Sequence, residues 1–546
     1  MSESSNIELL PIHNRKSQSH SAIPSRPHTP SLQPSNPRSA SPYSNVPPAA
    51  TLPILDRPQF MLLVLLYLLQ GIPVGLAFGS VPFLLKAKLS YSQVATFSLA
   101  SYPYSLKLLW SPVVDAIYNK RLGRRKSWII PIQLVSGFTL IYLGSNIDQL
   151  LEDPEKNLIT ITWAFFFLVF LCATQDIAVD GWALTILSPN ALSYASTAQT
   201  IGLNTGYFLS FTIFLAFNSS EFSNKYLRST PQDTGVLSLN TYLTFCGYLY
   251  LIVTVLVTFL VHEEPHHLRK NKRSDSIVDT ANKSKNTLDS LKHVYASMFQ
   301  VLRLPNIQAF IIILLISKIG FQANEGATNL KLLEKGFARE DLAITVLIDF
   351  PFEIIFGYYA AKWSTNDSGY LTPWLHAYLG RLVAAGCAFF VVMFFPSQGV
   401  TTSYFILVIL QHLLGSFMST IQFVSLNAFH TQIADPLIGG TYMTTLNTIS
   451  NLGGQWPRYI VLNMIDWLTI GSCSTETNDF EPFKVKDETD KIKCKDAGGT
   501  YQIVEDGYYM TNFLCIVVGC LLFFFWISPK VKHLQSLSTS AWRVKN

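Results

Sequence analysis

The chain has 546 residues, of which 49% are hydrophobic and only 14% are charged, and its formal net charge at pH 7 is +5. Soluble domains carry about a quarter charged residues, so this composition excludes an ordinary soluble protein and favours a membrane protein. The small net charge does not indicate nucleic-acid binding. The seven cysteines include no CxxC pair, so we expect neither a metal nor a cofactor.

The first segment, residues 1–51, is polar and rich in Ser and Pro, a composition that cannot build a core. We expect a disordered cytosolic tail and no cleavable signal peptide. The rest of the chain contains apolar blocks of about 20 residues, the length that crosses hydrocarbon, where a backbone must bond to itself as a helix. The sequence therefore predicts an all-α membrane protein with twelve transmembrane helices, near 58–80, 92–117, 127–145, 158–187, 192–217, 238–261, 305–327, 341–362, 373–395, 402–431, 438–464 and 508–528.

Lysine and arginine gather in loops that fall on one side of the membrane, which should be the cytosolic side. We therefore expect both termini in the cytosol. The predicted domains are a cytosolic tail (1–51), an N-terminal six-helix bundle (52–261), a cytosolic linker (262–303), a C-terminal six-helix bundle (304–530) with a lumenal loop (466–506), and a cytosolic tail (531–546). Cys473 and Cys494 lie in the lumenal loop, where a disulfide and two free thiols are both compatible with the sequence.

The two halves resemble each other at an offset of 248 residues, at which Gln70 faces Lys318 and Thr200 matches Thr448. Tyr-Pro-Tyr at 102–104 likewise matches Phe-Pro-Phe at 350–352. Two six-helix repeats joined by a long linker are typical of the major facilitator fold, which places a substrate site between the halves and exposes it to each side in turn.

Charged residues inside the expected spans are costly and therefore indicate function. Lys318 lies about 20 Å into the seventh span at a rise of 1.5 Å per residue, near the bilayer centre, and is a candidate for binding an anionic substrate. An ion pair with Glu325 is the alternative. Lys107, Arg381 and Arg458 are further candidates for phosphate binding, although each could instead snorkel or pair with a carboxylate.

Residues 435–457 form an unusual segment of small and hydroxylated residues, whose glycines suit close helix packing. Tyr442 and Asn447 bring polar groups that could line a cavity, and Trp456 could stack on an adenine. Gln70, the repeat partner of Lys318, completes the predicted substrate-binding set.

Five residues are candidates for gating. Asp176 and Asp180 lie four residues apart and share a helix face near the cytosolic end of the fourth span. A proton relay and a cytosolic gate are both compatible with this pair, and we favour the gate. Asp115, Arg124 and Arg125 resemble the loop motif with which major-facilitator transporters latch their halves, although the spacing from the aspartate is longer here.

Several segments resemble the acetyl-coenzyme A transporters of the endoplasmic reticulum membrane, solute carrier family 33, and the resemblance covers about 52–530. The segments are LLQGIPVGLA (68–77), SLKLLWSPVVDA (105–116), GRRKSW (123–128), ATQDIAVDGWALT (173–185), NKYLR (224–228), SKIGF (317–321) and DPLIGGTYMTTLNTISNLGGQWP (435–457). The resemblance implies import of acetyl-CoA from the cytosol into the lumen, where it supplies acetylation of protein lysines and of gangliosides. The implied partners are acetyl-CoA, the lipid bilayer and CoA as a counter-substrate, and a homodimer is compatible with the sequence.

Three alternatives remain at the level of sequence. One is a major-facilitator transporter of another organic anion, such as a peptidoglycan fragment or a pterin. Another is a polytopic acetyltransferase, which needs a histidine base, but His412 and His430 have no obvious partner in the sequence. The third is a receptor or scaffold that transports nothing. Exchange for CoA, proton coupling and facilitated diffusion are all open as coupling modes.

Overall fold

The computed structural model describes the chain from Pro53 onward with several gaps. The described residues are 53–119, 121–188, 191, 194–261, 263, 287–363, 369–397, 399–433, 439–474, 483–485, 490, 493–494 and 500–543. They belong to one compact unit, Val46–Asn546. The predicted tail, 1–51, lies outside the described residues.

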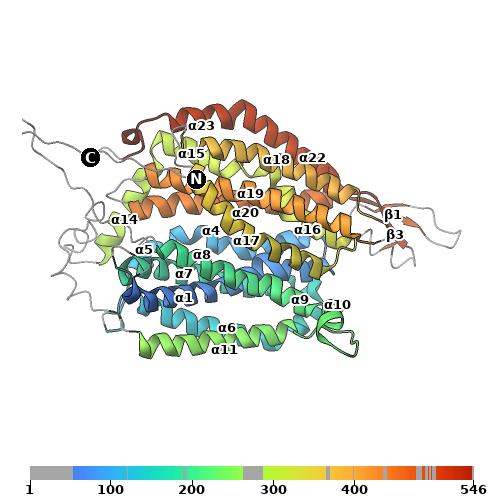
Figure 1. Cartoon of the computed structure of the whole chain (residues 1–546), viewed down its shortest axis with the longest axis horizontal. Coiled ribbons are helices and arrows are strands. Elements are labelled where there is room, and N and C mark those ends of the chain that lie inside the picture. The colour runs from blue at the N-terminus through green and yellow to red at the C-terminus, as the bar shows by residue number, and fades with distance from the viewer. Residues whose placement is uncertain are drawn as a thin grey trace, which may run out of the picture. The chain divides into compact units, whose positions relative to one another are not determined.

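The described helices of the N-terminal half lie between Ile54 and Leu260, and Figure 1 shows them in blue to green. Its main elements are α1 (Arg57–Gly75), the π-helical turn η2 (Leu76–Ser80), α2 (Val81–Lys86), α3 (Tyr91–Ser98), η3 (Leu99–Ser101), α4 (Tyr102–Leu106), η4 (Lys107–Leu109), α5 (Ser111–Ala116), α6 (Lys126–Glu152), α7 (Pro154–Ile186), α8 (Tyr194–Phe208), η6 (Leu209–Ile213), α9 (Phe214–Asn218), α10 (Ser220–Phe222) and α11 (Leu239–Leu260).

The C-terminal half follows α14 (Thr287–Leu302), a helix inside the predicted linker. Its elements are α15 (Pro305–Ile316), η8 (Ile319–Phe321), α16 (Gln322–Glu334), α17 (Arg339–Trp363), α18 (Thr372–Met393), α19 (Thr402–Ile433), α20 (Gly439–Leu468), α22 (Gly507–Leu522), η9 (Phe523–Ile527), α23 (Ser528–Gln535) and η10 (Thr539–Trp542).

Nine helical segments of the described chain are long and apolar enough to cross a membrane. They are Ile54–Lys86, Lys126–Glu152, Pro154–Ala183, Thr197–Asn218, Leu239–Leu260, Pro305–Glu334, Thr372–Met393, Thr402–His430 and Gly507–Gln535. The other three expected spans are also helical, but α3–α5 is interrupted by 3-10 turns, α17 carries several charges, and α20 is rich in polar residues. The predicted fold class is confirmed, while twelve spans are not fully confirmed.

The first span of each half is interrupted near its middle. In the N-terminal half the π-helical turn η2 separates α1 from α2, and in the C-terminal half a turn at Ser317–Lys318 and the 3-10 turn η8 separate α15 from α16. Such interruptions are tolerated at membrane depth only where protein or a water-filled cavity surrounds them. We therefore expect both interruptions to face the interior of the protein and not the lipid.

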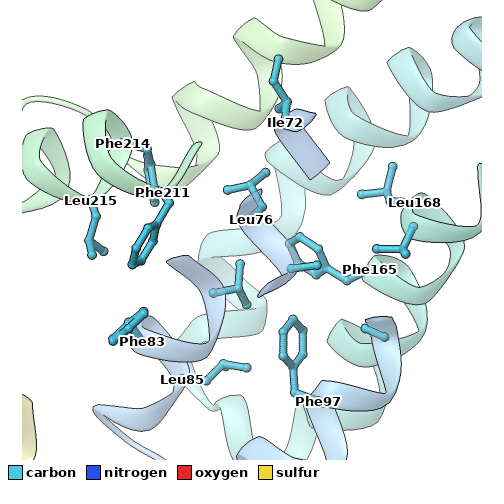
Figure 2. Close-up of a cluster of buried hydrophobic side chains, with 14 of the residues drawn as sticks. Ile72, Leu76, Phe83, Leu85, Phe97, Phe165, Leu168, Phe211, Phe214 and Leu215 are labelled. Carbon is cyan, nitrogen blue, oxygen red and sulfur yellow. The ribbon is translucent and has the colours of Figure 1, made fainter. Parts of the chain in front are cut away.

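Close packing joins the helices within the N-terminal half. A Cβ at Gly206 in α8 would overlap the backbone oxygen of Leu68 in α1, so only glycine allows this approach. Figure 2 shows the apolar cluster beside it, where Phe97 of α3 meets Phe165 of α7 edge to face, with ring centroids 5.6 Å apart. The hydrophobic effect does not drive helices together in lipid, so close van der Waals contacts of this kind stabilise the N-terminal half.

The polar segment 466–506 contains a small sheet that we did not predict. Its strands are β1 (Ile470–Ser474), β2 (Phe483–Val485) and β3 (Thr500–Glu505), and the order β2-β1-β3 is antiparallel throughout. Cys473 and Cys494 form a disulfide with their Cα atoms 5.8 Å apart, which resolves the choice that the sequence left open. Figure 1 shows this sheet at one end of the helices, the sheet end, and α14 with α5 at the other, the linker end.

Candidate functional site

Two adjoining cavities lie between the two halves. The cationic cavity has a volume of about 380 Å³ and is lined by Val74, Phe78, Tyr104, Ser105, Lys318, Gln322, Glu325, Asn451, Gly454, Gln455 and Arg458. The aromatic cavity has a volume of about 420 Å³ and is lined by Val74, Phe78, Gly79, Pro82, Phe83, Asn204, Tyr207, Phe208, Phe211, Glu325, Gly326, Asn329, Leu330, Val346, Asp349, Glu353, His412 and Arg458. Both volumes are typical of small-molecule sites, and the two cavities share the lining residues Val74, Phe78, Glu325 and Arg458.

Lys318 lines the cationic cavity from the interruption between α15 and α16. The ion pair with Glu325 that the sequence allowed is not formed, because Glu325 pairs with Arg381 instead. Lys318 is therefore placed as the prediction of an anion-binding lysine requires.

The environment of Arg381 differs from the one that phosphate binding would require. Besides its ion pair with Glu325, it donates a hydrogen bond of 2.5 Å to Gln422 Oε1, and its guanidinium lies 3.7 Å from the ring centroid of Phe321. Arg381 is buried and does not line either of the two cavities. Its contacts hold α16 and α19 against α18.

Arg458 and Gln322 line the cavity, and each has one buried polar atom without a hydrogen-bond partner among the described residues. Arg458 lines both cavities, and Gln322, only 3% exposed, lines the cationic cavity. Among the described residues, Arg458 Nε and Gln322 Oε1 are buried without a hydrogen-bond partner. Because buried polar groups are nearly always satisfied, these two atoms mark a part of the lining whose hydrogen bonds are incomplete in this conformation. Sequence reasoning missed Gln322, although it lies four residues from Lys318.

Lys107 and the two aspartates form a polar network within the N-terminal half. Lys107 of η4 forms an ion pair with the fully buried Asp176 of α7, and its Nζ lies 5.0 Å from the ring centroid of Tyr104. Asp180, one turn further, accepts hydrogen bonds from Tyr67 Oη at 2.7 Å and Gln199 Nε2 at 3.0 Å. The two aspartates therefore have separate partners.

The repeat partner of Lys318, Gln70, is fully buried in α1 and does not line either cavity. Among the described residues, neither its Oε1 nor its Nε2 has a hydrogen-bond partner. Trp456 of α20 donates from Nε1 to the backbone oxygen of Leu315 at 2.9 Å, beside the helix interruption. Trp456 thereby supports the segment that carries Lys318.

Two further predicted binding residues lie toward the linker end of α20. Tyr442 donates a hydrogen bond of 2.8 Å to the backbone oxygen of Trp542, and Asn447 Oδ1 lies 2.8 Å from His430 Nδ1. Neither lines the two cavities. In this arrangement Tyr442 and Asn447 connect α20 to the C-terminal segment and to α19.

The basic loop before α6 is held against the end of α11. The backbone N–H groups of Arg125 and Lys126 each donate to the carboxylate of Glu263 at 3.0 Å. A Cβ at Gly181 would overlap the Arg125 guanidinium, so this glycine gives the guanidinium its place beside α7. Arg124 also makes contacts. The side chain of Asp115, the fifth predicted gating residue, lies outside the described residues.

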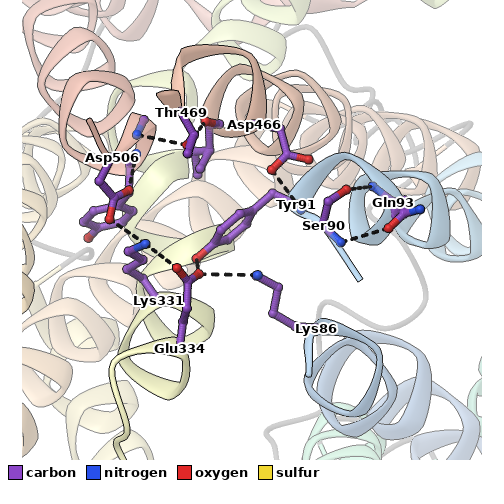
Figure 3. Close-up of polar contacts among 12 residues, drawn as sticks. Lys86, Ser90, Tyr91, Gln93, Lys331, Glu334, Asp466, Thr469 and Asp506 are labelled. Carbon is purple, nitrogen blue, oxygen red and sulfur yellow. Dashed lines mark hydrogen bonds and ion pairs between the residues drawn. The ribbon is translucent and has the colours of Figure 1, made fainter. Parts of the chain in front are cut away.

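The sheet end is closed by a cluster that joins the two halves, shown in Figure 3. We call Lys86, Tyr91, Lys331, Glu334 and Asp506 the sheet-end cluster. From the N-terminal half, Lys86 Nζ lies 3.4 Å from Glu334 Oε2 and Tyr91 Oη donates to the same oxygen at 3.0 Å. Within the C-terminal half, Lys331 pairs with Glu334 at 2.7 Å and with Asp506 at 2.5 Å.

A second contact reinforces this closure. Asp466 of α20 accepts hydrogen bonds from the backbone N–H groups of Tyr91 at 3.2 Å and Ser92 at 2.7 Å, at the N-terminus of α3 (Figure 3). A carboxylate is favoured there because the first N–H groups of a helix have no partner within it. Sequence reasoning did not find the sheet-end cluster, because its members are far apart in the chain.

His412, expected to have no partner, faces a carboxylate. Its Nε2 lies 3.4 Å from Asp349 Oδ2 in the aromatic cavity, one helix turn from Glu353. Asp349 Oδ1 is buried and, among the described residues, has no hydrogen-bond partner. The aromatic cavity therefore contains a polar face on α17 and α19 that the sequence did not predict.

Comparison with known proteins gives the family and the fold. The family described as acetyl-coenzyme A transporter 1 matches residues 59–369 and 365–544. An uncharacterized membrane protein of Saccharomyces cerevisiae is 50% identical over 551 residues, which cover 89% of this chain and 97% of that protein. An uncharacterized protein of Schizosaccharomyces pombe is 42% identical over 482 residues and 88% of each chain.

Among solved structures, a mutant of the nucleoside transporter NupG has a TM-score of 0.56 at 11% identity and covers 85% of this chain and 98% of that one. At this identity the likeness shows the fold alone. The neighbours in structure are major-facilitator transporters, and the match to the family covers most of the described residues. The chain therefore belongs to the acetyl-coenzyme A transporter 1 family and is a multi-pass membrane transporter with the major facilitator fold.

Proposed function

We propose that the protein carries acetyl-CoA across the endoplasmic reticulum membrane, from the cytosol into the lumen, by alternating access. The observation that carries this proposal is the cationic cavity, where Lys318 and Arg458 line a space between the two halves of a chain that belongs to this family. The family is one of transporters, so the acetyltransferase alternative has no support.

The chemistry of the substrate matches the polar groups of the cavity. Acetyl-CoA carries a diphosphate and a ribose phosphate, and phosphate is bound by the planar fork of arginine and the point charge of lysine. Arg458 supplies the fork and Lys318 the point charge, while Gln322 adds an amide. In the region of low dielectric within a membrane protein, these charges attract a polyanion far more strongly than they would in water.

Three observations support the direction and the topology. The disulfide between Cys473 and Cys494 suits an oxidising compartment, which would place the sheet end in the lumen. The basic loops then face the cytosol together with both termini and the linker 262–303. Contacts between the halves at the sheet end support a conformation closed to the lumen, from which cytosolic acetyl-CoA would be loaded.

The domain plan proposed for this cycle has two six-helix bundles, 52–261 and 304–530, that rock about the shared cavity. Imported acetyl-CoA would supply acetyl groups to lumenal proteins and gangliosides. Free CoA would be left in the lumen by that chemistry, so CoA is our proposed counter-substrate.

Uptake of labelled acetyl-CoA by purified protein in liposomes tests the proposal. We expect uptake above protein-free vesicles, stimulated by CoA loaded inside, with no acetyl acceptor present. Peptidoglycan fragments and pterins, tested as competitors, distinguish acetyl-CoA from other organic anions. Absence of uptake, or stronger competition by those compounds than by acetyl-CoA itself, would contradict the proposed substrate.

In microsomes, the proposed topology predicts that the disulfide between Cys473 and Cys494 resists a membrane-impermeant reductant until detergent is added. Reduction in intact vesicles of cytosol-out orientation would place the sheet on the cytosolic side instead.

A further inference from the structure

The aromatic cavity differs from the cationic cavity in the side chains that line it. One wall is built from the aromatic side chains of α8 and η6, and it continues into α2. The Phe83 and Phe211 rings are stacked with centroids 5.4 Å apart, and Tyr207 lies 5.8 Å from Phe211. Aromatic side chains gathered on one wall of a cavity provide a stacking surface for a planar ring, and nucleobases use such surfaces regardless of sequence.

The opposite wall offers hydrogen-bond acceptors. Asp349 and Glu353 lie four residues apart on α17, so they share a helix face toward the cavity. Asp349 Oδ2 is near His412, but its Oδ1 is buried without a partner among the described residues. A carboxylate accepts hydrogen bonds, so Glu353, which is exposed, and Asp349, after a rotation of its side chain, offer acceptors to a ligand that donates N–H groups.

The distribution of charge argues against placing the phosphates there. The third acidic residue of the lining, Glu325, is paired with Arg381, whereas Asp349 has only His412 nearby, and Glu353 shares that region. Phosphates beside these carboxylates would be repelled, and they are better placed with Lys318 and Arg458 in the adjoining cavity. The aromatic cavity therefore suits an uncharged, planar group that carries amine hydrogens and is attached to a polyanion.

We infer that the aromatic cavity binds the nucleobase of the substrate, and that Asp349 and Glu353 recognise its exocyclic amine. This inference rests on the proposed function, because acetyl-CoA carries adenine beside its phosphates. The ring would stack on Tyr207, beside the buried Phe211, while its 6-amino group donates to the carboxylates of α17. Arg458, which lines both cavities, would mark the boundary between the base and the phosphates.

The test compares acetyl-CoA with an analogue in which hydrogen replaces the 6-amino group of adenine. Both compete with labelled acetyl-CoA for uptake into proteoliposomes. For the wild-type protein we expect the analogue to compete about tenfold less well or worse, because a site built around a donor leaves its acceptors unpaired when that donor is missing.

Two variants then locate the recognition. Glu353→Ala and Asp349→Ala should bring the ratio of the two competition constants toward one. Tyr207→Leu should weaken both compounds and keep the ratio. Asp233→Asn, a change in an exposed loop, is the matched control and should keep the wild-type ratio and rate. The ratio isolates the amine contact, because each variant is compared with itself on two ligands that differ at one position.

Binding to detergent-purified protein, measured as the thermal shift given by each compound, provides the same ratio for any variant that no longer transports. Equal competition by the two compounds in the wild type, or an unchanged ratio in both α17 variants, would overturn the inference and leave acetyl-CoA transport standing. Failure of the wild-type protein to take up acetyl-CoA at all would instead reject the proposed function.

Discussion

Lys318 owes its position to the interruption of its own helix. The turn after α15 lets the side chain enter the cationic cavity, and Trp456 supports the neighbouring backbone at Leu315. A lysine at membrane depth costs about 2.5–3.5 kcal/mol on insertion scales, a cost that is unexplained if the residue has no role. We therefore propose that Lys318 binds the substrate.

Lys318→Ala should lower acetyl-CoA uptake by about tenfold or more, since a charge-assisted contact to phosphate contributes about 1.5–3 kcal/mol. The measurement is initial uptake in proteoliposomes at equal protein content. Lys292→Ala, on the exposed part of α14, is the control. Normal uptake by the Lys318 variant would remove this residue from the site.

The ion pair between Lys107 and Asp176 is expected to affect the stability of the protein. Asp176→Asn leaves the ammonium of Lys107 largely buried without its counter-charge, and breaking a buried pair from one side costs on the order of 3–5 kcal/mol. We expect a lower melting temperature of the purified protein. Combining it with Lys107→Met should restore much of the loss, whereas equal melting temperatures for wild type and the single variant would contradict a structural role for the pair.

At the scale of single residues, the sequence identified which charges are unusual but not what they contact. Lys318 and Arg458 line a cavity, and their binding of substrate stays a prediction, whereas Lys107 is paired with a residue 69 positions away. A pairing over such a separation is set by helix packing, which one sequence does not reveal. Gln322 and Glu353 were missed because the sequence does not show which polar side chains of a helix face a cavity.

At the scale of elements, small residues determine how closely α1 and α8 approach. Gly71 and Gly206 face each other across this contact, and a Cβ on either would overlap the backbone of the other helix. In lipid such contacts depend on van der Waals fit, so they tolerate added atoms poorly.

Gly206→Ala should therefore reduce the yield of folded protein and lower its melting temperature. The measurement is size-exclusion chromatography and thermal unfolding in one detergent. Gly386→Ala in α18 is the matched control, because no atom lies within 4 Å of the added Cβ; it should be neutral or slightly stabilising. Equal behaviour of the two variants would show that the close approach of α1 and α8 is not needed.

The elements also show where hydropathy is informative and where it fails. Long apolar helices such as α11 (Leu239–Leu260) fall within a residue of the predicted span, 238–261. The segment 466–506 was predicted as a loop, because strands of three to six residues with polar flanks lack a clear alternation. The helix interruption at Lys318 was likewise invisible, because a continuous apolar run does not reveal a broken hydrogen-bond ladder.

At the scale of the whole molecule, the contacts at the sheet end join the two halves, and we propose that they act as a gate to the cavity. Glu334 pairs with Lys86 and accepts a hydrogen bond from Tyr91, both of the other half. Its loss should therefore weaken the contact between the halves at the sheet end most. Opening toward the sheet end requires these contacts to separate, and their free energy therefore enters the balance of the two states.

Glu334→Gln should shift that balance toward the state open at the sheet end. A cysteine introduced by Asn451→Cys, in the cavity lining, should then react faster with an impermeant maleimide added from the sheet side. Glu155→Gln is the control, because Glu155 also lies near this end but accepts a hydrogen bond from Gln93 within its own half. Equal labelling rates in the two backgrounds would exclude the sheet-end cluster as a gate.

The sheet is continuous in sequence with two helices, since β1 follows α20 and β3 precedes α22. The same α20 carries Arg458 into the cavity and reaches across to α3 through Asp466. The disulfide joins Cys473 of β1 to Cys494, which lies between β2 and β3 in the sequence. An antibody fragment that binds this sheet is therefore expected to slow transport by restraining α20 and α22.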